Sequence, residues 1–127
     1  MIEYEGIHHV SLVVKDLQKT EQFYREVLGL EKLNRPDFGF PGAWLGIGSQ
    51  QLHLIVYDEA QTVRENKTIE SRDGHFAIRV KSFDKTIEHL KSHGVAYKAK
   101  PNSTAGFAQI FCCDPDGNLV EFNTEIN

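Results

Sequence analysis

The sequence contains an internal repeat that constrains its fold more than any other feature. At an offset of 66 residues, segment 9–20 (HVSLVVKDLQKT) aligns with segment 75–86 (HFAIRVKSFDKT). At an offset of 68 residues, His53 aligns with Glu121. A solenoid needs about three or more stacked repeats, so two copies predict two similar modules that share one structure.

The length of the chain favours a single domain built from both modules. Its 127 residues match the usual size of one domain, whereas half of that length buries too little surface to be stable alone. We therefore expect one domain over residues 1–127. Its first module is expected over 6–57, a polar linker without periodicity over 58–71, and the second module over 72–125.

Charge and hydropathy exclude several classes of partner. A formal net charge of −4 disfavours a surface for nucleic acid or anionic lipid. The N-terminus has neither the basic nor the apolar region of a signal peptide, and no stretch approaches the roughly 20 apolar residues of a membrane span. We expect a cytoplasmic protein that binds neither nucleic acid nor membrane. Cys112 and Cys113 are expected to be reduced, largely structural thiols, with a vicinal disulfide switch as the alternative.

Each module reads as a strand, a helix and three further strands. Asp16 and Ser82 are suited to begin the two helices, and Gly29 and Gly94 to end them. Apolar residues recur at helical spacing between these limits. The predicted strands are 7–14, 31–35, 43–47 and 50–57 in the first module, and 74–80, 95–100, 107–113 and 118–124 in the second.

Alternation along four of these strands separates an apolar face from a mixed one. Residues such as Val10 and Leu12, or Phe76 and Ile78, share the face that should pack beneath the helices. The mixed face of these strands carries His9, His53, His75 and Glu121. The pattern predicts an α+β fold of paired βαβββ modules. Its curved, cup-shaped mixed sheet carries helices on the outer face, and the four residues line a concave, partly polar cavity.

Imidazole and carboxylate groups together suit a divalent transition metal such as Zn, Ni, Co, Mn or Fe(II). We expect His9, His75 and Glu121 to bind such an ion, which would act as a Lewis acid toward a substrate oxygen. His53 is a further candidate ligand, with contact to the substrate or to the ligands as the alternative. A lone histidine on a strand is usually only a partly buried or surface residue, and His8, His89 and His93 are interpreted in that way.

Three segments carry a resemblance to a known family. HHVSLVVKDLQKTEQFYREVLGL (8–30), GHFAIRV (74–80) and DPDGNLVEF (114–122) resemble the glyoxalase/bleomycin-resistance/dioxygenase superfamily, also called vicinal oxygen chelate proteins. The resemblance covers nearly the whole chain. It implies a pair of βαβββ modules whose sheets form a cup around a metal.

The resemblance also assigns ligands by position. His9 matches the ligand of the first strand, His75 the ligand that opens the second module, and Glu121 the carboxylate after the DPDG turn. This triad also resembles those of fosfomycin thiol transferases and of the longer extradiol dioxygenases. His53 stands where glyoxalase I-like enzymes carry a Glu, which argues against lactoylglutathione lyase activity.

Together these features predict a metal-dependent lyase, isomerase or thiol transferase. A small-molecule substrate would chelate the metal through vicinal oxygens, with Glu121 or a metal-bound water as the base. Arg79 could hold a carboxylate or phosphonate, or else form a structural ion pair. Trp44 and Phe107, together with Phe38 and Phe40, could line the cup, or else pack in the core.

Two other functions remain open at this point. One is a metal-free protein that sequesters a ligand in an aromatic-lined cleft, like the bleomycin-binding members of the superfamily. The other is a non-catalytic protein that retains an ancestral site. The resemblance implies a homodimer, and it leaves open whether a cup forms within one chain or between two. It also leaves open whether the reaction requires a thiol.

Overall fold

The computed structural model describes residues 1–126, and Asn127, which closes the predicted domain, lies outside them. The chain divides into two compact units, Met1–Val63 and a second that begins at Arg64. The boundary falls inside the predicted linker 58–71. Each unit follows the predicted order of strand, helix and three strands, which makes the fold α+β.

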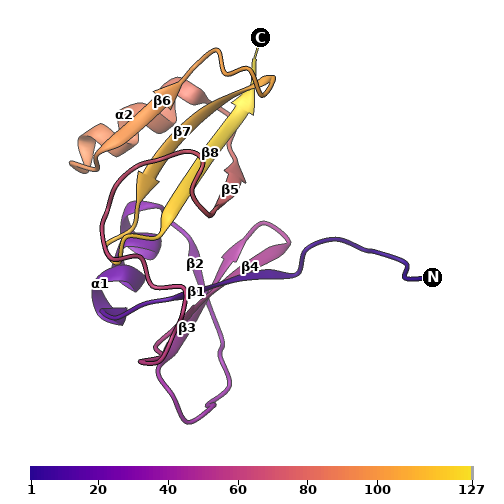
Figure 1. Cartoon of the computed structure of the whole chain (residues 1–127), viewed down its shortest axis with the longest axis vertical. Helices are drawn as coiled ribbons and strands as arrows, with labels where there is room; N and C mark the ends of the chain where they lie inside the picture. Colours follow the sequence, from indigo (N-terminus) through magenta and orange to yellow (C-terminus); the bar gives the residue numbers. More distant parts are fainter. Residues whose placement is uncertain (127) are drawn as a thin grey trace. The chain divides into compact units, whose positions relative to one another are not determined.

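The first unit is built on a mixed four-stranded sheet (Figure 1). Its strand order is β1-β4-β3-β2. Strand β1 runs parallel to β4, and the other neighbours are antiparallel. The strands are β1 (His9–Val13), β2 (Glu31–Leu33), β3 (Gly42–Ile47) and β4 (Gln50–Ile55). Leu45, Leu52 and Leu54 are fully buried and form the centre of its core.

The helical segment of this unit changes its hydrogen-bond pattern part of the way along. Helix α1 (Leu17–Gln22) begins at Asp16, whose carboxylate accepts from the Lys19 N–H at 3.1 Å. The next turn, η1 (Phe23–Val27), is a π-helix, with the Leu28 N–H donating to the Phe23 carbonyl at 3.0 Å. The sequence predicted one continuous α-helix here. Five residues are too few for hydrophobic spacing to distinguish a π-turn from an α-turn.

The second unit repeats the arrangement with the strand order β5-β8-β7-β6 (Figure 1). Ser82 caps helix α2 (Phe83–Ser92) by accepting from the Lys85 N–H at 3.1 Å. Helix α2 packs on β7 and buries Leu90. Gly94 follows the helix with φ +67°, a conformation that favours glycine. The strands are β5 (His75–Arg79), β6 (Tyr97–Lys100), β7 (Phe107–Cys113) and β8 (Leu119–Glu125).

The strand registers show that the repeat in sequence is a repeat in structure. In the first sheet His53 pairs with Ser11 on one side and Trp44 on the other. In the second sheet Glu121 pairs with Ala77 and Phe111. His53 and Glu121 therefore occupy the same place in their sheets, as the sequence alignment predicted.

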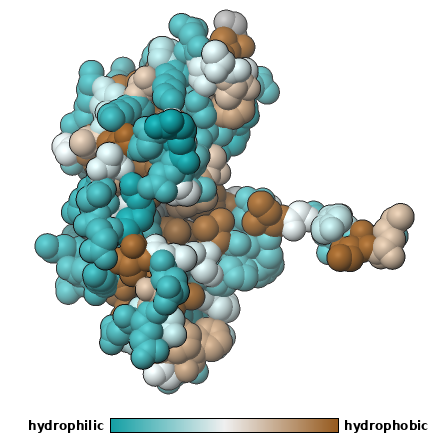
Figure 2. Space-filling model, viewed as in Figure 1, coloured by the Kyte–Doolittle hydropathy of each residue, from teal (hydrophilic) through white to brown (hydrophobic). Residues whose placement is uncertain are grey.

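Several predicted strand ends were wrong by one or two residues. Strand β1 begins at His9 instead of residue 7, β4 ends at Ile55, and β8 continues to Glu125. Before β1 the chain is extended, with exposed apolar residues at its N-terminal end (Figure 2). In the described part of the chain, no helix is long and apolar enough to cross a membrane.

Candidate metal ligands and their surroundings

His75 and Glu121 lie together on one face of the second sheet. His75 Nε2 is 2.9 Å from Glu121 Oε1, and only 4% of Glu121 is exposed. The second carboxylate oxygen, Oε2, accepts from Asn123 Nδ2 at 3.0 Å. The His75 ring also meets the edge of Phe111, at 5.4 Å between centroids. The sequence predicted both residues on the same face, and the structure places them in direct contact.

The other nitrogen of His75 fixes the chemistry of this contact. His75 Nδ1 is 2.7 Å from the Asp73 carbonyl oxygen. A carbonyl only accepts, so Nδ1 carries the hydrogen. In a neutral ring, Nε2 would then direct a lone pair at a carboxylate oxygen, and two acceptors 2.9 Å apart repel each other. The pair therefore needs a cation between its two atoms, either a proton or a metal ion.

Arg64 holds the segment that precedes His75, a role that the sequence analysis did not detect. Its guanidinium donates to the Thr68 carbonyl at 2.8 Å and lies 3.3 Å from Asp73 Oδ2. It also donates to the carbonyl of Gly117, in the β7–β8 turn. Because Asp73 contacts both Arg64 and His75, the hydrogen bonds of Arg64 connect the linker to the histidine. A lone arginine in a polar linker gives no periodic signal by which to identify this role.

In the first unit, three rings stack across neighbouring strands. The His53 ring lies parallel to His9 at 4.1 Å between centroids and to Trp44 at 4.3 Å, with interplanar angles of 16° and 9°. His53 Nε2 is 2.8 Å from Gln51 Oε1. The amide oxygen only accepts, so Nε2 donates and Nδ1 is the acceptor nitrogen of the neutral ring. The interpretation of His8 as an isolated surface histidine was incomplete, because its Nδ1 lies 2.8 Å from His9 Nδ1.

The surroundings of His53 favour its neutral form. Burial of the ring lowers the pKa of His53 below its usual 6.5, and the nearby His9, His8 and Arg35 lower it further. A neutral imidazole is the form that binds metals. It is also the form that can accept a hydrogen bond from a substrate.

An aromatic series continues from His53 toward the loop before β3. Trp44 lies 5.9 Å from Phe38, and Phe38 lies 5.7 Å from Phe40, between ring centroids. The Arg35 guanidinium covers both phenylalanine rings, at 4.9 and 5.1 Å. Phe38 and Phe40 are 49% and 44% exposed, so they are not core residues of the described chain. They are available to contact a ligand.

The predicted substrate residues of the second unit lie away from the His75–Glu121 pair. Arg79 is four residues beyond His75 on β5, which is about 13 Å along an extended strand. Its guanidinium lies 5.9 Å from the centre of the Phe107 ring. Among residues 1–126 Arg79 forms no ion pair, so the alternative of a structural ion pair does not apply there.

The structure brings the four predicted ligands together as two pairs. His9 and His53 share the face of the first sheet, and His75 and Glu121 share the face of the second. Within the described residues, no group of three or more His, Cys, Asp or Glu side chains is arranged to hold a metal ion.

Comparison with known proteins identifies the class to which this fold and these residues belong. Residues 6–122 match the sequence profile of the Glyoxalase/Bleomycin resistance protein/Dioxygenase superfamily, and the chain belongs to that superfamily. The fold agrees, because the crystal structure of a putative glyoxalase family protein from Bacillus anthracis superposes with a TM-score of 0.81. It is 24% identical, and the match covers 98% of this chain and 99% of that one.

Two curated relatives are similar in sequence. Glyoxylase I 4 of Arabidopsis thaliana is 30% identical over 91% of this chain and 68% of its own length. Glutathione transferase FosA of Serratia marcescens is 30% identical over 94% of this chain and 80% of its own length. Three further plant relatives, among them lactoylglutathione lyase GLX1 of Arabidopsis thaliana, are longer. The chain spans only 34% to 42% of their lengths.

Proposed function

We propose that this protein is a divalent-metal-dependent enzyme of the superfamily. It acts as a lyase, an isomerase or a thiol transferase on a small substrate that presents neighbouring oxygens. His9, His75 and Glu121 are the proposed metal ligands, and His53 is a fourth ligand or a residue that contacts the substrate. Arg79, Trp44 and Phe107 are the proposed substrate contacts.

The contact between His75 and Glu121 carries this proposal. Asp73 makes Nδ1 the protonated nitrogen of His75, so both atoms of the 2.9 Å contact are electron-pair donors. Glu121 is buried, and a buried carboxylate needs a compensating charge. A transition-metal ion meets both requirements, because imidazole nitrogen and carboxylate oxygen are suitable ligands for it. The donor set therefore fits the ion.

The side chains around the pair have separate roles in this proposal. Asn123 donates to Glu121 Oε2, which orients the carboxylate and leaves Oε1 directed at His75. When bound, the metal would stabilise negative charge that develops on a substrate oxygen. Glu121 is the proposed base that removes a proton from the substrate. Its low exposure keeps water from competing for that proton.

The relatives support this class of reaction but do not identify one particular reaction within it. The names of similar proteins include lactoylglutathione lyases and a glutathione transferase. The presence of His53 in place of a carboxylate favours a transferase or another lyase over lactoylglutathione lyase activity. The substrates to test first are 2-oxoaldehyde–thiol adducts and fosfomycin with a thiol. By its family resemblance the active protein is proposed to be a homodimer, which light scattering measures directly.

One observation favours a second candidate, a metal-free protein that sequesters a ligand. The exposed rings of Phe38 and Phe40 continue the stack formed by Trp44 and His53. Such a surface can hold a planar or apolar ligand by stacking alone. This candidate predicts ligand binding that is unchanged by chelators and by substitution of His75.

Elemental mass spectrometry of protein purified without a chelator or a metal-binding tag tests the proposal. We expect about one transition-metal ion per chain, and its loss in His75→Ala and in Glu121→Ala. His93→Ala, in the turn after α2, is the matched control and should retain the metal. His53→Ala separates its two roles, because a ligand lowers the metal content and a substrate contact does not. Absence of metal after reconstitution with Zn, Ni, Co, Mn and Fe(II) would refute the proposal.

A further inference from the structure

The Arg35 side chain contains a buried donor without a partner. In residues 1–126 its Nε is the one buried side-chain nitrogen or oxygen that forms no hydrogen bond. The guanidinium donates from Nη2 to the Phe40 carbonyl at 3.1 Å. Among the same residues it forms no ion pair with a carboxylate. A buried donor without an acceptor destabilises a fold, so its presence indicates a ligand that supplies the acceptor.

The guanidinium of Arg35 lies on the face of the first sheet that carries His53. Gly42 and Trp44 share one face of β3, because side chains alternate along a strand. Trp44 pairs with His53, so this is also the face of His53. A β-carbon at Gly42 would lie 2.8 Å from Arg35 Nη2. Glycine at this position therefore leaves room for the guanidinium beside Trp44.

Phe38 and Phe40 cover this guanidinium, with ring centres 4.9 and 5.1 Å from its central carbon. Both rings are about half exposed and belong to the loop between β2 and β3. Between them Gly39 adopts φ +81°, a conformation that favours glycine. Phe38 also lies 5.9 Å from Trp44 between ring centroids. An anion that reaches Nε therefore displaces one of the two rings, and the aromatic surface beside it is available to the rest of the ligand.

The equivalent cation of the second unit has its acceptor within the chain. By the strand registers, Lys100 on β6 corresponds to the position two residues after Leu33, which is Arg35. Lys100 Nζ lies 5.7 Å from the centre of the Phe111 ring and donates to Ser71 Oγ at 2.7 Å. Each unit thus holds a cation near an aromatic ring, but Lys100 is paired within its own unit. The buried donor without a partner is specific to the first unit.

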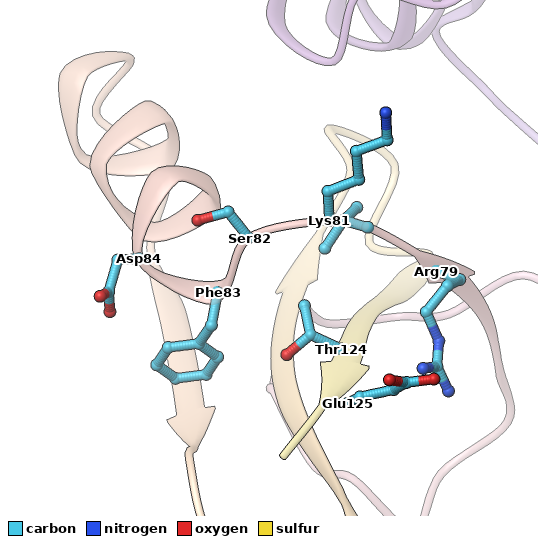
Figure 3. Close-up of a pocket in the computed structure, with 8 residues that line it drawn as sticks. Arg79, Lys81, Ser82, Phe83, Asp84, Thr124 and Glu125 are labelled. Carbon is cyan, nitrogen blue, oxygen red and sulfur yellow. The ribbon is translucent and has the colours of Figure 1, made fainter. Parts of the chain in front are cut away.

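Arg79, the residue for which the sequence suggested a bound carboxylate, has different surroundings. It lines a cavity at the β5–α2 connection together with Asp84 and Glu125 (Figure 3). Two carboxylates beside that space disfavour an anion there. In the described part of the chain no carboxylate pairs with Arg35, so Arg35 is better suited to bind an anion.

We propose that Arg35 binds a carboxylate of the substrate, and that Phe38 and Trp44 hold a planar, apolar part of the same molecule. The carboxylate accepts from Nε and from a terminal nitrogen of the guanidinium, an arrangement of two parallel hydrogen bonds that arginine favours. Arg35 is thus added to the proposed substrate contacts. Its role rests on the proposed function, since the substrate is that of the same site.

Trp44 reports binding by its fluorescence, because it is the only tryptophan of the chain. The full chain is titrated with benzoate in the presence of a chelator. The comparison probes are benzamide, which is uncharged and has nearly the same shape, and acetate, which lacks the ring. We expect a saturable change with benzoate and at least tenfold weaker binding of benzamide and of acetate, because each lacks one of the two groups that the site binds. Equal affinity for benzoate and either comparison probe, or no saturable change with benzoate, would overturn the proposal.

Two variants and one control complete the test. Arg35→Gln should weaken the binding of benzoate about tenfold and leave that of benzamide nearly unchanged, because it removes the charged donors. Arg35→Lys keeps the charge but not the planar pair of donors, so it should retain only part of the affinity. Arg72→Gln, at an exposed arginine of the second unit, is the matched control and should change nothing. Urea denaturation checks that each variant is folded, and Arg35→Lys carries the test if Arg35→Gln is not. Unchanged affinity for benzoate in the folded Arg35 variants would overturn the proposal.

The metal content of the same preparations, measured by elemental mass spectrometry, separates this test from that of the proposed function. Bound metal without a preference for benzoate would refute the role of Arg35 and retain the metal proposal. Selective binding of benzoate by a chain that takes up no metal would retain the role of Arg35 and refute the metal proposal.

Discussion

His75 and Glu121 meet through two atoms that both carry electron pairs. The Asp73 carbonyl, 2.7 Å from His75 Nδ1, prevents the ring from turning its N–H toward the carboxylate 2.9 Å away. The pair is thus arranged for a positive charge before any ion binds. Arg64 extends this arrangement into the linker, because it contacts Asp73 as well as the β7–β8 turn. The preorganisation of this half of the proposed site comes from residues outside the proposed ligand set.

Substitution of Glu121 by glutamine should weaken the binding of metal. In Glu121→Gln the amide N–H can donate to His75 Nε2, which satisfies the contact without a cation and removes the carboxylate ligand. We expect a loss of Zn²⁺ affinity of at least tenfold, measured by titration calorimetry. Unchanged affinity in this variant would contradict the arrangement.

Substitution of Arg64 should weaken both the second unit and the binding of metal. Arg64→Ala removes hydrogen bonds to Thr68 and Gly117 and the contact with Asp73. Its side chain is 15% exposed, so the lost carbonyl partners are partly buried. We expect a loss of about 2 kcal/mol in urea denaturation, together with a weaker affinity for Co²⁺ measured from its visible absorption.

Arg64→Lys distinguishes a positioning role from a general loss of stability. Lysine keeps the charge near Asp73 but cannot reach three acceptors with one planar group. If Arg64→Lys binds Co²⁺ more tightly than Arg64→Ala but is hardly more stable, the result would support a positioning role of Arg64, which acts on His75 through Asp73. Arg72→Ala is the matched control, because Arg72 is 90% exposed and pairs only locally with Glu70. It should leave both quantities unchanged.

The positions of the candidate ligands on the strands could be predicted from the sequence. The contacts made by the linker residues could not. Side chains alternate between the two faces of a strand. His75 and Glu121 are therefore assigned to the same face of the sheet, wherever their strands begin and end. Errors of one or two residues at the ends of β1 and β8 therefore did not move any candidate ligand. Arg64 and Asp73 act through a loop whose path depends on tertiary hydrogen bonds. The stacking of His53 between His9 and Trp44 likewise depends on rotamers, which the sequence does not encode locally.

The ring of His53 should make the stability of the protein depend on pH. Burial is the main cause that lowers the pKa of His53 below 6.5, so the unfolded chain binds this proton more readily than the folded one. Stability from this residue is complete above about pH 6.5 and declines as the pH falls below that value. Denaturation of the unaltered protein and His53→Gln across pH 5 to 8 measures the effect. The free energies of unfolding of the two proteins should converge at low pH and differ most above pH 6.5.

A second substitution tests the cause of that dependence. Trp44→Ala removes one of the two rings that enclose His53 and lets water reach it. The pKa of His53, followed by NMR of the ring protons, should therefore rise toward 6.5. His89→Gln, on α2 of the other unit, is the control and should leave it unchanged. An unaltered pKa in Trp44→Ala would mean that the neighbouring charges, and not burial, dominate.

The two adjacent cysteines should differ sharply in reactivity. Both are free, and burial raises the pKa of Cys112 to about 12. Only about one Cys112 thiol in ten thousand is then ionised at pH 8, and the thiolate is the reactive form. Cys113 is partly exposed, with its sulfur 3.6 Å from Arg64 Nη1 and 3.5 Å from the Lys67 carbonyl oxygen. Iodoacetamide should label Cys113 first, as located by peptide mass spectrometry.

Controls separate access to the thiols from a disulfide between them. In urea both cysteines should react at similar rates, because unfolding removes the burial of Cys112. Cys113→Ser should leave the native protein almost unlabelled, and Cys112→Ser should label as fast as the unaltered chain. Neighbouring strand residues point to opposite faces, which opposes a bond between them. A chain that resists labelling in urea until a reductant is added would instead indicate a vicinal disulfide, and the interpretation of both residues as structural thiols would be wrong.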